Sequence, residues 1–192
     1  MRSTLRNIGV AICLLSIPLT AEAIKDPETG QHFADTTTCG GQPAQVVGVG
    51  VREAMMGIDV YAVAIYASKA AQTDSSLQKT SGCVKILDRF VRNVPASKIR
   101  DAWHKGFKQQ GISASDPLLK QFMAAVDSDM KKHGFMVLEI DQDRVFYRYQ
   151  KRSVSLTKAS ALGRAIKAIY LGPSSAIPTL VKSVKALGRA RP

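Results

Sequence analysis

The chain has 192 residues, a formal net charge of +12, three cysteines and three histidines. This length suits one domain with a hydrophobic core of its own. The cysteines and histidines lack metal-ligand spacing and the basic residues form no nucleic-acid-binding motif, so we expect no metal, no cofactor and no nucleic-acid partner.

The first 23 residues have the features of a cleaved signal peptide. Arg2 and Arg6 give a positive start, residues 8–19 are apolar, and an A-x-A cleavage signal ends at Ala23. The apolar run is too short for a stable membrane anchor. We therefore predict cleavage after Ala23 and a periplasmic or secreted protein. Cleavage removes two arginines and one glutamate and lowers the net charge from +12 to +11, so the mature chain stays strongly basic.

After the signal peptide, residues 24–43 are rich in Asp, Thr, Gly and Pro. This composition predicts an irregular lead-in with a short strand near residues 31–33. The main domain is expected over residues 44–192. No internal repeat divides it.

The two faces of the first expected strand of the domain, residues 44–52, carry different kinds of side chain. Period-2 alternation puts Gly48, Gly50 and Arg52 on one face and valines on the other. Glycine leaves the backbone uncovered beside a cationic side chain, so an anion could bind there. The same residues would also fit a purely structural role, with a β-bulge or a crossing backbone beside a solvated arginine. The binding interpretation and the structural interpretation both stay open.

The remaining elements follow from periodicity and from start and stop signals. Strands, then helices, then strands, then helices predict an α+β fold with no βαβ rhythm. The expected strands are 58–67, 83–93, 135–140, 145–149 and 153–156; the expected helices are 68–80, one starting at Pro95, one starting at Asp116, one ended by Gly172 and one ended by Gly188.

Large apolar residues recur at helical spacing in the two middle helices. This spacing is typical of a core face, although the same side chains could line an apolar ligand cleft. The residues concerned are Trp103, Phe107, Phe122, Met123 and Met130.

Cys39 and Cys83 remain after cleavage, and each lies just before or near a predicted strand start. Export to an oxidising compartment makes a disulfide between them one candidate. Two free thiols are the other, because the sequence does not fix their separation in space.

Several segments resemble the chalcone isomerase-like proteins, the exported bacterial branch in particular. The segments are G-V-G-V-R at 48–52, D-V-Y-A-V-A-I-Y-A at 59–67, F-V-R-N-V at 90–94, A-W-H-K-G-F at 102–107 and A-I-K-A-I-Y-L-G-P at 165–173. The resemblance implies an open-faced antiparallel β-sheet with helices layered on one face and a ligand cleft between the layers.

The resemblance also implies roles for particular residues. Arg52 matches the family arginine that holds an oxyanion in the isomerases and a carboxylate in the fatty-acid binders. Tyr61 falls where the isomerases have a catalytic threonine and the fatty-acid binders a tyrosine, and Arg92 lies near an isomerase lysine. The isomerases' catalytic tyrosine and asparagine fall near Ile99 and Gly106, whose side chains donate no hydrogen bond.

These observations favour an exported, non-catalytic protein that binds a small amphipathic carboxylate or phenolic anion, such as a fatty acid. The expected ligand-binding residues are Arg52, Tyr61, Gly48, Gly50 and Arg92. One alternative is a chalcone isomerase-type intramolecular lyase that uses Arg52 and Tyr61 in catalysis. A second alternative is a basic surface that docks on an anionic membrane or an acidic partner, because no acidic residue follows Asp143.

Overall fold

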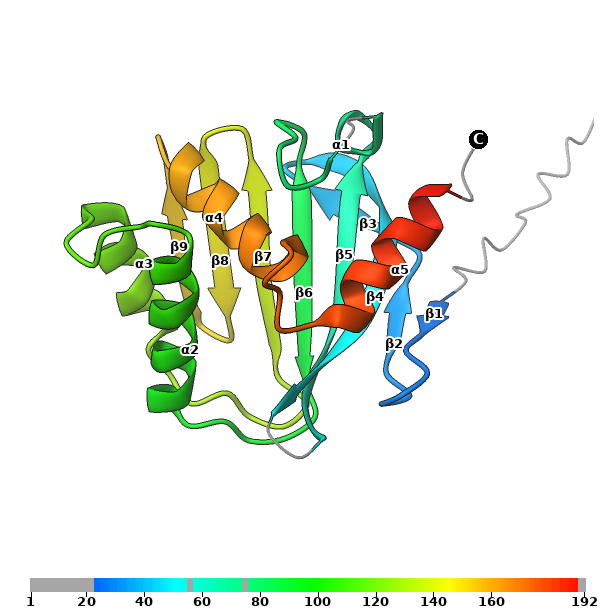
Figure 1. The fold of residues 1–192 in the computed structure, drawn as a ribbon, viewed down its shortest axis with the longest axis horizontal. Helices are drawn as coiled ribbons and strands as arrows, with labels where there is room; N and C mark the ends of the chain where they lie inside the picture. The colour runs from blue at the N-terminus through cyan, green and yellow to red at the C-terminus, as the bar shows by residue number, and fades with distance from the viewer. Residues whose placement is uncertain (1–22, 55–56, 74–75, 190–192) are drawn as a thin grey trace, which may run out of the picture.

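The computed structural model describes residues 23–54, 57–73 and 76–189, so the predicted signal peptide lies outside the described residues except for Ala23. Its centre is a seven-stranded antiparallel sheet whose strands follow one another in chain order from β3 to β9 (Figure 1). A separate two-stranded hairpin, β1–β2, precedes it. The strands are β1 (Ala23–Lys25), β2 (His32–Ala34), β3 (Thr36–Cys39), β4 (Gln42–Ala54), β5 (Ile58–Ser68), β6 (Val84–Phe90), β7 (Phe135–Asp141), β8 (Arg144–Tyr149) and β9 (Arg152–Leu156).

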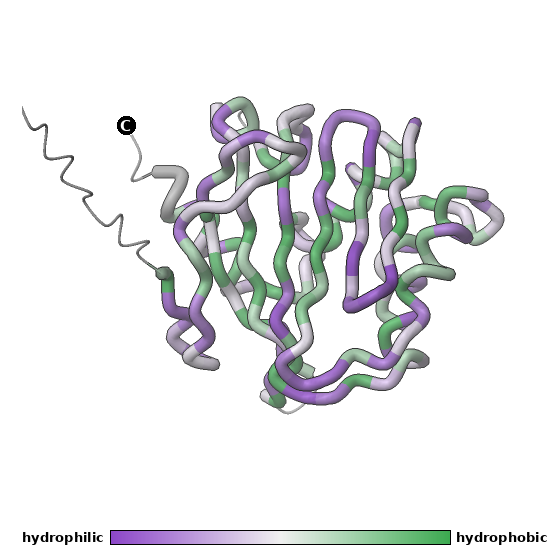
Figure 2. The backbone as a smooth tube through the Cα atoms, turned by 180° about the vertical axis from the view of Figure 1, so that it is seen from behind, coloured by the Kyte–Doolittle hydropathy of each residue, from purple (hydrophilic) through white to green (hydrophobic). Residues whose placement is uncertain are grey.

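Helices α2 to α5 lie on one face of this sheet (Figure 1). The opposite face, with its mixture of polar and apolar residues, is partly covered by β1–β2 (Figure 2). The expected open-faced α+β fold is confirmed. Among the described segments, none of the helices has the length and apolar character needed to cross a lipid bilayer. The helices are α1 (Lys69–Thr73), α2 (Ala96–Gln109), α3 (Pro117–Val126), α4 (Ser160–Leu171) and α5 (Pro178–Arg189).

The main core lies between the sheet and the helices, because the strands alternate apolar side chains toward the helix face. On β6 the buried positions on this face are Val84, Ile86, Asp88 and Phe90. A smaller core on the other face surrounds Tyr66. Asp88 is thus a carboxylate within an apolar layer.

The N-terminal part is more regular than the sequence predicts. Residues 24–43 were expected to form a lead-in outside the domain, but β3 pairs with β4 and belongs to the main sheet. The strand expected near 31–33 is β2, which pairs with β1 around a turn where the Asp26 carboxylate accepts hydrogen bonds from Thr29. The domain therefore begins before residue 44.

Three other boundaries differ from expectation. Helix α1 ends at Thr73 rather than near residue 80, and β6 ends at Phe90 rather than near residue 93. Helix α3 ends at Val126, so Met130 instead pairs with Val94 in an isolated bridge. This bridge lets the chain leave β6 and return toward β7, which periodicity alone does not reveal.

The Cys39–Cys83 disulfide is present, with a Cα–Cα distance of 5.8 Å. It joins the end of β3 to the residue before β6. Strands β4 and β5 lie between these two in the sheet, so the bond ties together segments that are not hydrogen-bonded neighbours.

Candidate functional site

The two glycines of β4 contact helix α5. A β-carbon at Gly50 would lie 2.5 Å from the backbone nitrogen of Leu180, and one at Gly48 would lie 2.4 Å from Cγ2 of Val184. Such distances are shorter than van der Waals contact, so only glycine permits this approach. The open backbone that the sequence analysis expected for a ligand is therefore filled by α5.

Helix α5 also supplies hydrogen-bond acceptors to β4. Strand β3 pairs with β4 only as far as Gln45. Beyond that residue, the backbone N–H of Val49 donates to Ser183 Oγ at 3.0 Å and that of Val51 donates to Thr179 Oγ1 at 3.2 Å. Two hydroxyls one helical turn apart thus satisfy alternate donors on the strand.

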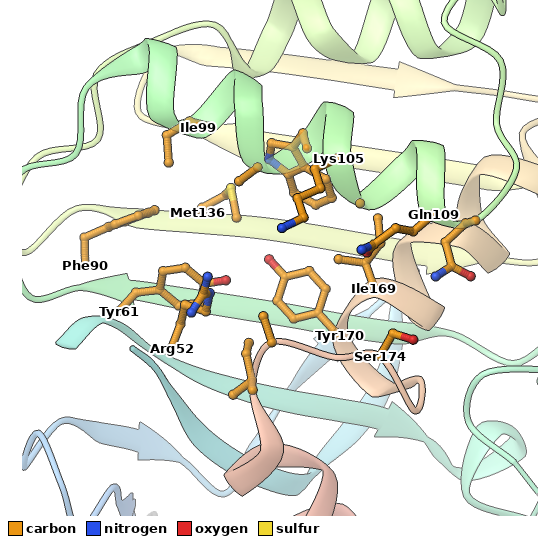
Figure 3. A pocket seen from close by; sticks show the side chains of 16 residues that line it. Arg52, Tyr61, Phe90, Ile99, Lys105, Gln109, Met136, Ile169, Tyr170 and Ser174 are labelled. Carbon is orange, nitrogen blue, oxygen red and sulfur yellow. The ribbon is translucent and has the colours of Figure 1, made fainter. Parts of the chain in front are cut away.

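A cavity of about 240 Å³ lies where α2, α4 and the segment before α5 meet strands β4 to β7 (Figure 3). Apolar side chains make most of its wall. Its lining residues with polar side chains are Arg52, Tyr61, Trp103, Lys105, Gln109, Gln110, Tyr170 and Ser174.

Arg52 and Tyr61 face each other across β4 and β5 and lie together at one end of the cavity (Figure 3). Arg52 is partly buried. None of the ion pairs formed among the described residues includes it. Burial raises the pKa of the Tyr61 hydroxyl well above its ordinary value, with Asp88 adding to the rise and the Arg52 charge opposing it.

Tyr170 connects this end of the cavity to a buried carboxyl group. Its hydroxyl lies 2.6 Å from Oδ2 of Asp88, to which it donates. Asp88 is 0% exposed, and its Oδ1 has no hydrogen-bond partner among the described residues. Burial raises the pKa of Asp88 to about 8, although the hydrogen bond from Tyr170 opposes the rise.

This geometry can be set beside known proteins. The sequence profile of the chalcone isomerase-like family matches residues 28–183. The chain belongs to the chalcone isomerase-like family. A solved structure of similar fold is that of a fatty-acid binding protein from Arabidopsis thaliana, with a TM-score of 0.72, 19% sequence identity, and coverage of 88% of this chain and 97% of that chain. No curated protein sequence matches the chain.

Within this chalcone isomerase-like fold, some of the predicted site residues come together and others do not. Arg52 and Tyr61 line one cavity, as do Ile99 and Gly106, near which the family resemblance puts the isomerases' catalytic tyrosine and asparagine. Arg92 is exposed and does not line the cavity, because the chain bends away from the sheet after Phe90. Gly48 and Gly50, which lie under α5, do not line it either.

The aromatic residues of the helices divide in a similar way. Trp103 lines the cavity and stacks on Phe107, with ring centroids 5.4 Å apart. Phe107 and Phe122 are fully buried and belong to the core with Met123 and Met130. The cleft interpretation therefore holds for Trp103 alone among these five residues.

Sequence reasoning in this chalcone isomerase-like chain missed Asp88, Tyr170, Lys105 and Gln109. A carboxylate among apolar residues on one face of β6 was a readable signal for Asp88. Tyr170 lies in the segment that carries the family resemblance, but nothing in its spacing assigned it a role. The described residues contain no group of three or more His, Cys, Asp or Glu side chains placed to hold a metal ion.

Proposed function

We propose that this chalcone isomerase-like protein is exported and binds a small amphipathic anion, such as a fatty acid, without catalysis. The observation that carries the proposal is the Arg52 guanidinium, which forms no ion pair among the described residues and lies at one end of a largely apolar cavity. A guanidinium pairs bidentately with a carboxylate and stays charged at any ambient pH. Partial burial strengthens such a pair relative to water.

The walls and size of the cavity support a ligand with a modest apolar tail. Phe90, Ile99, Trp103 and Ile169 offer apolar contact beyond the arginine end. A volume of about 240 Å³ equals that of about eight water molecules in the liquid, and it lies just below the range of about 300–1,000 Å³ usual for ligand pockets. We therefore propose a short or medium-length tail. The Arabidopsis protein of similar fold is a fatty-acid binding protein, which supports a fatty acid as the class of ligand.

Export is part of the proposal and rests on the A-x-A signal ending at Ala23. The Cys39–Cys83 disulfide supports it, because such bonds persist in oxidising compartments. Two measurements test it. Mass spectrometry of the protein from its native cell should give a chain starting at Ile24, and cell fractionation should find that chain outside the cytoplasm.

The central part of the proposal, the binding of a carboxylate at Arg52, is tested by measuring decanoate binding with isothermal titration calorimetry. Arg52→Ala should weaken binding about 10- to 100-fold, the loss expected for a charge-assisted hydrogen-bonding pair. Arg92→Ala is the matched control and should bind like the wild type, since Arg92 is exposed and outside the cavity. Equal affinity of wild type and Arg52→Ala would refute the assignment.

The isomerase alternative has less support. Ile99 and Gly106 line the cavity but offer no side-chain donor to a developing enolate, and the loss of one such donor costs roughly 3 to 4 kcal/mol of the barrier reduction. The hydroxyls that line the cavity belong to Tyr61, Tyr170 and Ser174, and the one on Tyr170 already donates to Asp88. Incubation with a hydroxychalcone should give racemic product at the background rate. An enantiomeric excess would favour the isomerase.

The basic-surface alternative depends on where the C-terminal charges lie. Arg144, Arg148 and Arg152 belong to β8 and β9 at one edge of the sheet, whereas Lys182 and Lys185 belong to α5, which packs on β4 near the other edge. Lys167 is buried and donates to the backbone oxygen of Thr80. The charges are therefore spread over the molecule. We expect only weak, salt-sensitive binding to anionic vesicles.

A further inference from the structure

The cavity has polar side chains at an exposed end as well as beside Arg52. We call the set at the exposed end the polar rim; it consists of Lys105 and Gln109 on α2, Gln110 just after α2, and Ser174 between α4 and α5. All of the rim except Gln110 is exposed, whereas Arg52 and Tyr61 are partly buried. Figure 3 shows Gln109 and Ser174 on the far side of Tyr170 from Arg52. The cavity therefore has a polar group at each end.

The spacing of residues on α2 explains why Lys105 belongs to the rim. Ile99 and Trp103 are buried on the face that α2 turns toward the sheet, while Lys105 and Gln109, one helical turn apart, are exposed and still line the cavity. Asp101 lies one turn before Lys105, in the order that favours an ion pair along a helix. None of the ion pairs formed among the described residues joins these two side chains. Figure 3 shows Lys105 extending from α2 toward the cavity instead.

The charges on the cavity wall are all positive. Arg52 and Lys105 line the cavity, and no Asp or Glu is among the described residues that line it. Neither cation takes part in an ion pair within the described part of the chain. The rest of the wall is largely apolar and includes Trp103 and Ile169. A ligand that complements this wall has an anionic group at each end and an apolar chain between them.

The exposure of the rim bears on the second end of the ligand. A plain fatty acid with its carboxylate at Arg52 would place its methyl end beside polar side chains and close to solvent, where little apolar surface is removed from water. A second carboxylate at the rim would keep part of its hydration, so the cost of burying a charge would be small. The Lys105 amine attracts such a group, and Gln109 and Ser174 can donate hydrogen bonds to it.

We propose that the cavity selects a dicarboxylate, a chain with a carboxylate at each end, and that it holds one carboxylate at Arg52 and the other at Lys105 on the polar rim. This inference rests on the proposed function of the same cavity, which requires only the carboxylate at Arg52. It adds the chemistry of the other end of the ligand. It also makes Lys105 a residue that determines specificity.

Isothermal titration calorimetry with matched pairs of acids tests the proposal. The pairs are hexanoate with hexanedioate, octanoate with octanedioate, and decanoate with decanedioate, because the fit depends on chain length. In the pair whose length spans Arg52 and Lys105, the diacid should bind about 3- to 10-fold more tightly than the monoacid, the gain expected from one charge pair near the surface. If the chain ended against apolar side chains instead, the second carboxylate would weaken binding.

Two lysine variants show whether the preference depends on the rim. Lys105→Gln should remove the advantage of the diacid and leave the affinity for the monoacid nearly unchanged. Lys108→Gln is the matched control, because Lys108 is exposed on the same helix, loses the same charge and does not line the cavity. This control should keep the advantage of the diacid.

The outcomes separate the two proposals. Equal or weaker binding of the diacid in all three pairs would overturn the dicarboxylate assignment, and so would an advantage that Lys105→Gln keeps or that both lysine variants lose alike. In each of these cases the proposed function stands as long as monoacid binding depends on Arg52. Failure of every acid to bind the folded wild type would overturn both proposals.

Discussion

Asp88 is the residue whose surroundings change its chemistry most. It occupies a position on β6 between Ile86 and Phe90 on the buried face, where an apolar side chain would be usual. Its only side-chain hydrogen bond among the described residues is the one from Tyr170. A buried carboxylate with one satisfied oxygen favours its neutral form, so the folding free energy must depend on pH.

The sign of this dependence follows from the pKa values. In the unfolded chain Asp88 loses its proton above about pH 4, whereas in the folded protein burial raises its pKa to about 8. Between these values the folded state binds more protons, so the free energy of unfolding falls as pH rises and levels off above pH 8. Asp88→Asn should therefore match the wild type near pH 4 and exceed its stability by up to about 5 kcal/mol at pH 8.

Urea denaturation at several pH values, with the disulfide intact, measures this difference. Asp101→Asn is a suitable control, because Asp101 is exposed on α2. Its difference from the wild type should stay nearly constant with pH. A constant difference for Asp88→Asn as well would mean that Asp88 is ionised in the folded protein.

The sequence predicted the chemistry at the residue scale only in part. Arg52 and Tyr61 were found because they lie on adjacent strands within segments that resemble the family. Asp88 and Tyr170 are 82 residues apart, and no periodicity relates β6 to α4. Their contact depends on how α4 crosses the sheet. Arg92 was assigned to the site by its likeness to an isomerase lysine, but it lies beyond Phe90, where β6 ends, and does not line the cavity.

At the scale of elements, the packing of α5 against β4 depends on glycine. Leu180 approaches the strand backbone at Gly50, while Thr179 and Ser183 accept hydrogen bonds from the next donors along β4. This packing holds the segment that carries Ile177 at the cavity wall. Alternation predicted the bare face of this strand, but it could not show that a helix from the far end of the chain covers it.

Gly50→Ala tests this arrangement. Its new methyl group would lie 2.5 Å from the backbone nitrogen of Leu180, so α5 would have to move as a unit. We expect a loss of about 3 kcal/mol or more in the free energy of unfolding, the upper end for overpacked sites, because the new methyl group meets backbone atoms of α5 rather than a flexible side chain. Gly41→Ala meets no atom within 4 Å and should lose only about 1 to 2 kcal/mol from its left-handed backbone. Similar losses in both variants would argue against close packing of α5.

At the scale of the whole molecule, the order of the later strands and the layers could be predicted. The pairing of β3 with β4 at the start of the sheet could not. Period-2 alternation predicted strands β5 to β9, and the family resemblance implied that they form one antiparallel sheet with helices on one face, as observed. Strand β3 is the polar sequence Thr36 to Cys39, which gives no apolar alternation, and so it was included in an irregular lead-in. The prediction of the disulfide depended on where β3 lies. Because β3 was not placed in the sheet, the distance from Cys39 to Cys83 was undetermined.

Removal of the disulfide should destabilise the whole domain. The bond closes a loop over a sequence separation of 44 residues, for which chain entropy predicts a loss of about 4 kcal/mol. The double variant Cys39→Ala, Cys83→Ala should therefore unfold at a lower urea concentration than the oxidised wild type. Reduced wild type should match the variant, and no change in either would contradict a structural role for the bond.

The pairing of a carboxylate with Arg52 can be observed at the ligand itself. We would record the ¹³C NMR signal of decanoate labelled at its carboxyl carbon, bound to the protein, as a function of pH. The Arg52 charge should hold the pKa of the bound carboxyl below that of free decanoate in the wild type and in Arg92→Ala, and this depression should disappear in Arg52→Ala. A bound carboxyl that titrates in the wild type as it does in water would contradict the proposed site.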